Sequence, residues 1–382
     1  MRTVHQDGHV GWLITSHRLA REMLVDDRFS ARSDLRRSAV GESSGALMAP
    51  PLPGQFISMD RPEHTRYRRL LAKYFTSNRL EQMTPWINDL VAAQLDILVR
   101  AATPADLVAQ FAMPIPSMAI CELLGVPGNH RELVQQINYG YSMADSVDER
   151  NGYISRLYGY LSQLIKYKRL SAGSDLLVEI IADNPELTDE ELLQLTLGLV
   201  LGGHETTANM ISLGVFALLE HPDQLHAMIA DPANDHTAVS ELLRYLTVTH
   251  IGLPYRAALE DVDLGGAEVR KGDTVTVALP AANRDRDAFT TPDELDVRRT
   301  AARGHLAFGH GAHRCLGQHL AELELRIAYR QLFERLPSLR LAVDATQVPM
   351  RTFATIYGPR TLPVTWDAGT TGPQELPSEV AS

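Results

Sequence analysis

The feature that most constrains the fold is a long apolar segment at residues 192–219. A segment of this length is either a membrane-spanning helix or a helix buried in the core of a globular protein. His204, Glu205 and two threonines lie in its middle, and a helix that faces lipid tolerates such groups only at high cost. The segment therefore predicts a buried core helix and no membrane span.

Helical periodicity extends well beyond this segment. It dominates residues 63–246, with Pro and Gly breaks at 103–104, 125–128 and 184–185. A further, strongly amphipathic helix is expected to begin at Cys315. Most of the chain is thus expected to be helical.

Strand patterns lie outside the helical stretch. Residues 10–15 are a short apolar strand candidate, followed by a helix with a Ser cap at residues 16–27. After Pro254 polar and apolar residues alternate around a DLGG turn, which predicts a small antiparallel sheet. Residues 41–56 are rich in Gly, Ser and Pro and predict a long loop, of a length that is usually functional.

These elements predict a mainly α protein with a small β part. We expect one large helical domain over residues 1–366 and a flexible tail over the polar residues 367–382.

Charge and cysteine usage exclude several kinds of function. The formal net charge is -11, and an acidic surface argues against nucleic acid as the main partner. The two cysteines, Cys121 and Cys315, lie far apart in the sequence, so a disulfide framework is not expected. No secretory signal is visible at the N-terminus, and a cytoplasmic location is expected.

The most informative short segment is FGHGAHRCLG, residues 308–317. Cys315 is expected where a Gly-rich loop becomes the first turn of a helix, and the free N–H groups and helix dipole there would stabilise a thiolate. The glycines let the backbone approach a flat ligand, and such a thiolate can bind haem iron.

Two other interpretations of this segment remain open. A lone cysteine is most often a small buried core residue. Zinc is the second alternative, because His305, His310, His313 and His319 surround Cys315, although structural zinc sites usually contain two or more cysteines.

The segment is similar to the haem-binding loop of cytochrome P450 enzymes, FGxGxHxCLG, at every specified position. The resemblance implies the cytochrome P450 fold and one b-type haem (iron protoporphyrin IX), with Cys315 as the axial ligand of the iron. It also implies that His313 contacts a haem propionate.

The core helix resembles a second motif of that family. LGGHETT, residues 201–207, is similar to the oxygen-activation segment, in which Glu205 and Thr206 would be the catalytic acid–alcohol pair that delivers protons. Gly202 and Gly203 are expected to weaken the helix and open space between its turns. Alone, the segment could equally be a helix-breaking glycine pair with a capping-type Glu.

Further motifs resemble parts of the family that hold the haem. Residues 58–71 resemble the segment whose His and Arg bind the propionates, here His64 and Arg68, and Arg256 matches a further propionate ligand. Without the family pattern, the HTRYRR run would most often be a solvated basic face. Cys121, in an amphipathic helix, is expected to be a core residue and not a ligand.

ELLR, residues 241–244, matches the ExxR motif of the family, whose Glu and Arg join a later Arg in bracing the haem loop. Arg299 fits the position of that later residue, but Arg298 is adjacent and the register is open.

The resemblance implies a monooxygenase that uses O2 to hydroxylate or epoxidise a mostly hydrophobic small molecule, such as a bacterial natural product or a xenobiotic. Electrons would come from NAD(P)H through a ferredoxin reductase and an acidic ferredoxin, which we expect to dock near Arg66, Arg69, Lys73 and Arg314. Oxidative coupling or ring formation on the same scaffold is an alternative, and a non-catalytic haem or zinc protein is another. The residues expected to line the substrate site are mainly apolar: Leu47, Met48, Leu52, the helices within 138–175, Val200, Leu201, Val248, Ile251 and the stretch near Thr355.

Overall fold

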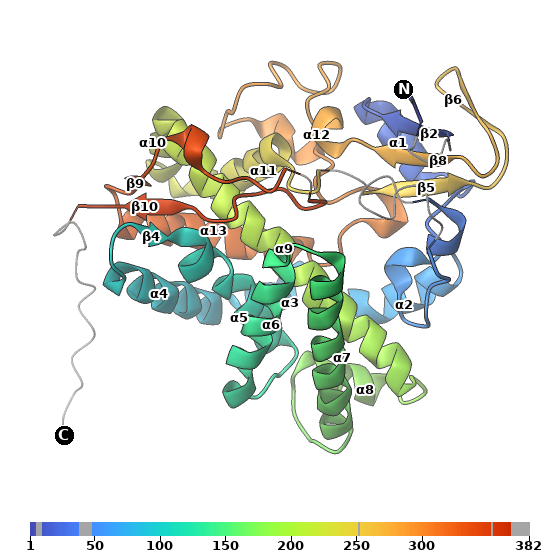
Figure 1. The fold of residues 1–382 in the computed structure, drawn as a ribbon, viewed down its shortest axis with the longest axis horizontal. Coiled ribbons are helices and arrows are strands. Elements are labelled where there is room, and N and C mark those ends of the chain that lie inside the picture. The colour runs from blue at the N-terminus through green and yellow to red at the C-terminus, as the bar shows by residue number, and fades with distance from the viewer. Residues whose placement is uncertain (5–9, 38–47, 251–252, 353, 368–382) are drawn as a thin grey trace.

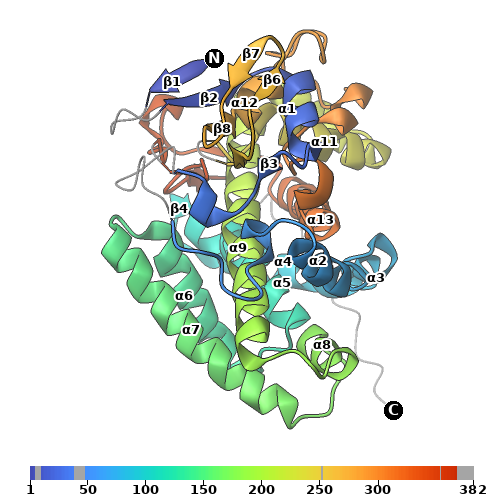
Figure 2. The same ribbon diagram turned by 90° about the vertical axis from the view of Figure 1, so that its right-hand side faces the viewer.

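The computed structural model describes residues 1–4, 10–37, 48–250, 253–352 and 354–367. Its central element is helix α9 (Asp189–Glu220), which runs through the middle of the molecule in both ribbon views (Figures 1 and 2). A capping box starts this helix, because the Thr188 hydroxyl accepts from the Glu191 N–H and the Glu191 carboxylate accepts from the Thr188 N–H. Most of its residues are buried, as the apolar segment predicts. Among the described residues, no helix is long and apolar enough to cross a membrane.

The other helices surround α9, with α6 and α7 along one side and α13 on another (Figure 2). The predicted helical stretch is confirmed, because it starts with α2 and ends with α11. The predicted breaks fall between α4 and α5, between α5 and α6, and between α8 and α9. The bounds are α1 (His17–Val25), α2 (Glu63–Ala72), α3 (Ser77–Glu81), α4 (Thr84–Arg100), α5 (Pro114–Leu123), α6 (Arg131–Met143), α7 (Val147–Arg169), α8 (Leu176–Asp183), α10 (Pro222–Ile229), α11 (Asp235–Leu246), α12 (Leu279–Ala282) and α13 (Gln318–Arg335).

The largest sheet has the strand order β1-β2-β8-β5-β3. Its strands are β1 (Arg2–Val4), β2 (Val10–Ile14), β3 (Phe29–Ser30), β5 (Tyr255–Ala258) and β8 (Thr274–Val277). The antiparallel arrangement predicted after Pro254 is confirmed for β5 with β8, and the early strand β2 adds a parallel pair with β8. The sheet is mixed because β2 runs parallel to β8, whereas the pairs of β1 with β2, β3 with β5 and β5 with β8 are antiparallel.

Two smaller sheets complete the β part. Strands β6 (Val262–Leu264) and β7 (Ala267–Val269) form the hairpin that DLGG predicts, and Gly265 and Gly266 both have positive φ, at 62° and 83°, as this turn requires. In the third sheet, β10 (Pro363–Thr365) lies between β4 (Ala105–Asp106) and β9 (Arg340–Leu341).

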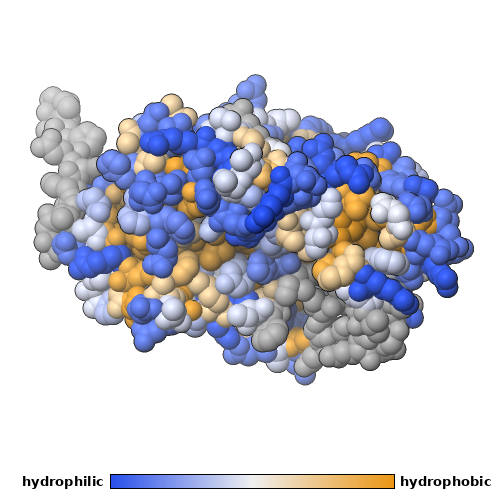
Figure 3. Space-filling model, turned by 90° about the horizontal axis from the view of Figure 1, so that it is seen from above, coloured by the Kyte–Doolittle hydropathy of each residue, from blue (hydrophilic) through white to orange (hydrophobic). Residues whose placement is uncertain are grey.

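The interior consists of two apolar clusters. The larger one surrounds α9, and the smaller one lies between the large sheet and helices α1 and α12. Leu306 is buried in the smaller cluster and fixes the start of the segment that leads to Cys315. On the face seen in Figure 3, hydrophilic residues cover most of the surface and apolar residues gather in limited areas.

Part of the predicted long loop lies outside the described residues. From residue 48 onward it contains no regular element until a 3-10 turn at Phe56–Ser58. The predicted C-terminal tail lies outside the described residues from 368 onward.

Candidate active site

The loop before Cys315 is built on glycines in the left-handed region. Gly309 and Gly311 have φ values of 69° and 72°. A Cβ at Gly311 would lie 2.7 Å from the carbonyl oxygen of Leu24, so only glycine fits there. The Cys315 N–H donates to the Phe308 carbonyl at 2.8 Å and closes the loop. Helix α13 has Gly317 as its N-cap, so Cys315 lies just before the helix and not in its first turn, which corrects the sequence prediction.

The surroundings of the Cys315 thiol combine exposure with desolvation. The side chain is exposed, yet burial by the protein around it raises its pKa. The Gly317 N–H and the cations Arg68 and Arg314 act in the opposite direction but do not outweigh burial. A metal ion bound to the sulfur would favour the thiolate form against this desolvation.

The structure brings together the four residues predicted to bind propionates. His64 and Arg68 lie on α2, Arg256 on β5, and His313 in the 3-10 turn Gly311–His313. The rings of His64 and His313 are 4.0 Å apart between centroids. Both ring nitrogens of His64 are buried without a partner. Burial, followed by nearby cations, lowers the pKa of His64 to about 4 and that of His313 to about 2.

This cluster carries more positive charge than its surroundings balance. Arg256 is 6% exposed, and burial lowers its pKa to about 10. Within the described ranges, no carboxylate lies within ion-pair distance of Arg68 or Arg256. Buried cations without an anion are unfavourable. A ligand with two carboxylates, such as haem, would supply both the missing charge and acceptors for the unpaired donors.

A hollow of about 610 Å³ opens beside α2 and the cysteine loop. Its lining includes His64 and Arg68 from the predicted cofactor set and Ala312 from the cysteine loop. The remaining lining residues are Arg61, Pro62, Thr65, Arg66 and Arg69. The residues present therefore fit an anionic prosthetic group held between α2 and the cysteine loop.

Helix α9 presents an open face at Gly202 and Thr206. Gly202 is exposed although most of the helix is buried, and a Cβ placed there would meet no atom within 4 Å. The Thr206 hydroxyl is half-buried and donates to the Gly202 carbonyl at 2.9 Å. The helix continues unbroken through both glycines, so the expected opening between its turns is absent. Instead, Gly202 leaves open space beside an intact helix.

The neighbouring Glu205 has a partner that the sequence does not indicate. Arg351 Nη2 lies 2.5 Å from the Glu205 carboxylate, and both side chains are less than one-tenth exposed. Arg351 is held in place by its N–H, which donates to the Gly358 carbonyl. The only signal available from sequence was the general rule that a buried carboxylate needs a cation.

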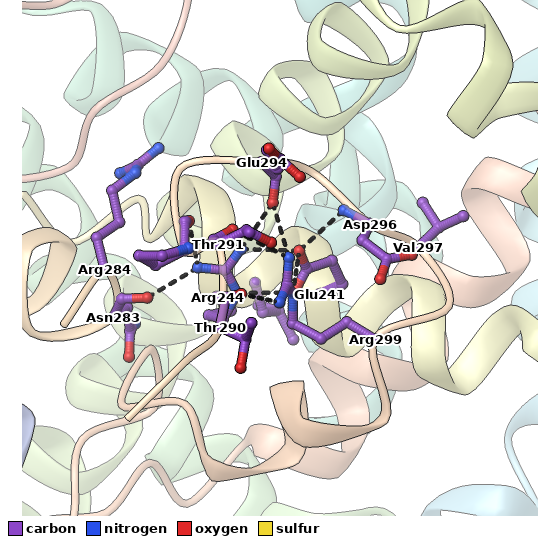
Figure 4. A network of polar contacts seen from close by, with 12 residues as sticks. Glu241, Arg244, Asn283, Arg284, Thr290, Thr291, Glu294, Asp296, Val297 and Arg299 are labelled. Atoms are coloured by element: carbon purple, nitrogen blue, oxygen red, sulfur yellow. Dashed lines mark hydrogen bonds and ion pairs between the residues drawn. The ribbon is translucent and has the colours of Figure 1, made fainter. Parts of the chain in front are cut away.

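The ExxR residues form a fully buried network (Figure 4). Arg244 and Glu241 are joined by two bonds of 2.7 and 2.8 Å, and Arg299 Nε lies 3.1 Å from the same carboxylate. This geometry settles the open register in favour of Arg299, while Arg298 is exposed. Arg244 also donates to the Asn283 carbonyl, and the Asn283 side chain accepts from the Leu306 N–H at 2.7 Å. The network thus braces the segment that leads to the cysteine loop.

Comparison with known proteins agrees with this geometry. A family model described as Cytochrome P450 matches residues 141–231 and 236–353. Cytochrome P450 105C1 of Streptomyces sp is 45% identical over 367 residues, which cover 96% of this chain and 91% of that protein. The chain belongs to the cytochrome P450 family.

Other relatives of this cytochrome P450 are similar over the same length. The Vitamin D3 dihydroxylase of Streptomyces griseolus is 41% identical and covers 96% of this chain and 90% of its own. The crystal structure of cytochrome P450 MoxA from Nonomuraea recticatena superposes with a TM-score of 0.88 at 40% identity, covering 96% of this chain and 92% of that one. The mainly α cytochrome P450 fold is therefore confirmed. The protein is a haem-dependent monooxygenase of the bacterial type, which acts on a small molecule with O2.

The alternatives for the two cysteines can now be compared. Cys121 is buried in this cytochrome P450, and desolvation raises its pKa to about 12, which confirms it as a core residue. In the part of the chain that the structure describes, no group of three His, Cys, Asp or Glu side chains could hold a metal ion. The zinc interpretation of the histidines around Cys315 is therefore not supported.

The expected substrate lining is placed only in part. Val200 and Leu201 lie on α9, where Val200 is buried and Leu201 half-buried. Val248 is buried and Thr355 half-buried, and their chain neighbours Thr249 and Ile356 form a β-bridge. Met48 and Leu52 are exposed. Leu47 and Ile251 lie outside the described residues.

Proposed function

We propose that this cytochrome P450 binds one b-type haem through Cys315 and hydroxylates or epoxidises a mostly hydrophobic small molecule. The observation that carries this proposal is the largely buried set of cationic and imidazole donors that α2, β5 and the cysteine loop bring together. No carboxylate of the described residues balances that set.

When bound there, haem supplies the iron at which O2 is reduced and from which one oxygen atom is transferred to the substrate. Cys315 would hold the iron, while Arg68, Arg256 and His313 would donate to the propionates. His64, with two unpartnered ring nitrogens, would be a further donor.

Protons would reach the open face of α9 through Thr206 and Glu205. The Thr206 hydroxyl must exchange its bond to the Gly202 carbonyl in order to donate a proton into the open space. Glu205 would resupply that proton after exchanging its bond to Arg351 for one to water. Arg351 thus sets the resting position of the acid.

The names of relatives support the class of substrate. They include a Vitamin D3 dihydroxylase and a Pentalenic acid synthase, and one similar structure is a complex of CYP105P1 with filipin I. A hydrophobic natural product or xenobiotic agrees with the buried Val200 and Val248 of the expected lining.

We further propose that electrons arrive from NAD(P)H through a ferredoxin reductase and an acidic ferredoxin. Of the four basic residues expected at the docking surface, Arg66 pairs with Glu191 and Lys73 pairs with Asp183. Arg69 and Arg314 are exposed, and among the described residues neither has an ion-pair partner. These two residues carry the docking proposal.

A single domain over residues 1–366, with a tail over 367–382, and a cytoplasmic location complete the proposal. The single domain is supported by pairing between distant segments, since β2 pairs with β8 and β4 pairs with β10.

The ligand assignment is tested by exchanging each cysteine. Cys315→His should abolish the red-shifted Soret band of the reduced, CO-bound protein and the monooxygenase activity, because imidazole replaces the thiolate. The matched control Cys121→Ala should keep both. Extraction of the haem by acidified organic solvent checks the b-type, since covalently attached haem would stay with the protein. Loss of the band in the Cys121 variant with retention in the Cys315 variant would refute the assignment.

A further inference from the structure

Arg36 is a buried cation that none of the recognised motifs contains. It follows the 3-10 turn Ser33–Leu35 and is 6% exposed. Its guanidinium lies 4.1 Å from the centroid of the Tyr255 ring and donates to the Tyr255 carbonyl at 3.2 Å and to the Ser58 hydroxyl at 3.3 Å. Its Nε is buried without any partner. The side chain is therefore held in place while one donor stays unused.

Arg256 converges on the same point. Its Nη1 donates to the Tyr255 carbonyl at 3.0 Å, so two guanidinium groups share one neutral acceptor. Both side chains are 6% exposed. A backbone carbonyl offers only partial negative charge, which cannot balance two buried cations.

Among the described residues, the carboxylate that acts on this pair already has other partners. Asp60 is the carboxylate whose charge they sense most, but it accepts from the Ser30 hydroxyl at 2.5 Å and from the Ala31 N–H at 2.7 Å. Across the described parts of the chain, no carboxylate forms an ion pair with Arg36. The charge is thus left for a ligand to balance.

The position of Arg36 connects it to the candidate cofactor site. Arg36 shares the Tyr255 carbonyl with Arg256, one of the predicted propionate donors, and its bond to the Ser58 hydroxyl ties it to the segment that leads into α2, which carries His64 and Arg68. We propose that Arg36 is a fifth donor to the haem propionates, sharing a carboxylate with Arg256. The inference rests on the proposed haem at Cys315 and adds a ligand from a distant part of the chain.

The test compares holoproteins that differ at Arg36. Arg36→Gln keeps a polar side chain but removes the charge, and Arg36→Lys keeps the charge but removes the fork of donors. Arg32→Gln is the matched control, because Arg32 lies one turn earlier, is exposed and pairs with Asp34 at 2.7 Å. Two properties are measured: the rate of haem transfer to excess apomyoglobin and the midpoint potential of the iron.

In Arg36→Gln, haem loss should be about tenfold faster, which is the size expected for loss of one charged hydrogen bond. The potential should fall, because a nearby cation stabilises the reduced state. Arg36→Lys should restore the potential and lose haem at an intermediate rate. If Arg36 only linked Ser58 to Tyr255, its replacement would change neither the rate of haem loss nor the midpoint potential.

The proposal is overturned if Arg36→Gln matches Arg32→Gln in both measurements. Should Arg36→Gln fail to accumulate as folded protein, the haem-loss rate of Arg36→Lys decides, and a rate equal to the control also overturns it. A wild-type protein without the red-shifted CO band would refute the ligation by Cys315 instead, so the two failures can be told apart.

Discussion

At the scale of single residues, the proposed proton donors both rest in bonds that they must give up. Thr206 donates to the Gly202 carbonyl, and Glu205 is held by Arg351. The bond of Thr206 is an ordinary backbone contact within one turn, which a water molecule can replace. In the proposed relay, Thr206 can therefore donate a proton only after a group in the open space beside Gly202 replaces the Gly202 carbonyl as partner of its hydroxyl.

Thr206→Ala removes this hydroxyl with little loss of volume, so haem and substrate binding should survive. NAD(P)H should still be consumed, but hydrogen peroxide should replace organic product. Glu205→Gln should slow turnover by about 10²–10⁴-fold and show a solvent isotope effect, because general acid–base groups contribute that much. The measurement is the ratio of product to NAD(P)H, with peroxide assayed in parallel. Thr207→Ala, at the adjacent buried threonine, is the control. An unchanged ratio in the Thr206 variant means that this segment is not the relay.

Residue types and spacing indicate most residues of the proposed site but not its compensating charges. Cys315, His313, His64, Arg68 and Arg256 follow motifs in which the neighbouring residues carry the signal. Arg351 is 146 residues from Glu205, and Arg36 is 219 residues from the Tyr255 carbonyl. Neither has a local pattern, because their roles arise only when distant segments fold together.

At the scale of elements, helices α9 and α13 pack closely at one glycine. A Cβ at Gly214 would lie 2.0 Å from the Tyr329 hydroxyl oxygen, which donates to the Met210 carbonyl at 2.5 Å. Both helices belong to the larger core cluster, so neither can move away freely. Gly214 is therefore needed for the close contact, whereas the exposed Gly159 on α7 has open space around it.

The same substitution at these two glycines should have opposite effects. Gly214→Ala should destabilise the protein by about 1–3 kcal/mol through overpacking and loss of the Tyr329 bond. Gly159→Ala should stabilise it by about 0.4–1 kcal/mol, since alanine is a better helix former and fits without contact. Thermal unfolding of the holoproteins measures both. A Gly214 variant as stable as the wild type would contradict the packing argument.

Element positions were predictable where a periodic pattern is long. The helical stretch starts and ends where the sequence indicates, at Glu63 in α2 and Leu246 in α11. The parallel pairing of β2 with β8 and the two-residue strands β4 and β9 were not predicted. Strands of two residues are too short to show a periodic pattern. The direction of pairing between β2 and β8 depends on a distant partner that the local sequence does not specify.

At the scale of the whole molecule, an acidic protein presents a local basic surface near its cysteine loop. The formal net charge is -11, yet four arginines line the hollow beside α2. An acidic ferredoxin would be repelled by the protein as a whole and attracted at this site, so charge would orient the encounter.

Reduction by ferredoxin should therefore slow as salt rises, because screening weakens the attraction. At low salt, Arg69→Glu should make reduction by ferredoxin slower than in the unsubstituted protein. Arg100→Glu, at the exposed end of α4 away from α2 (Figure 1), is the charge-matched control and should have a smaller effect. Stopped-flow reduction at several ionic strengths measures these rates. A rate that is indifferent to salt and to Arg69→Glu would contradict docking at this surface.

The pairing of β10 with β4 has a consequence for how the protein is made. Strand β4 at residues 105–106 stays without its partner until residues 363–365 have left the ribosome. The cysteine loop likewise needs the Arg244 network. The residues proposed to bind haem range from residue 36 to residue 315. Helices near α4 and α5 can form during translation, but the fold closes only after nearly all described residues have been synthesised. Capture of the cofactor is thus a late event in biogenesis, and a ribosome stalled before β10 would carry a chain that cannot complete its fold.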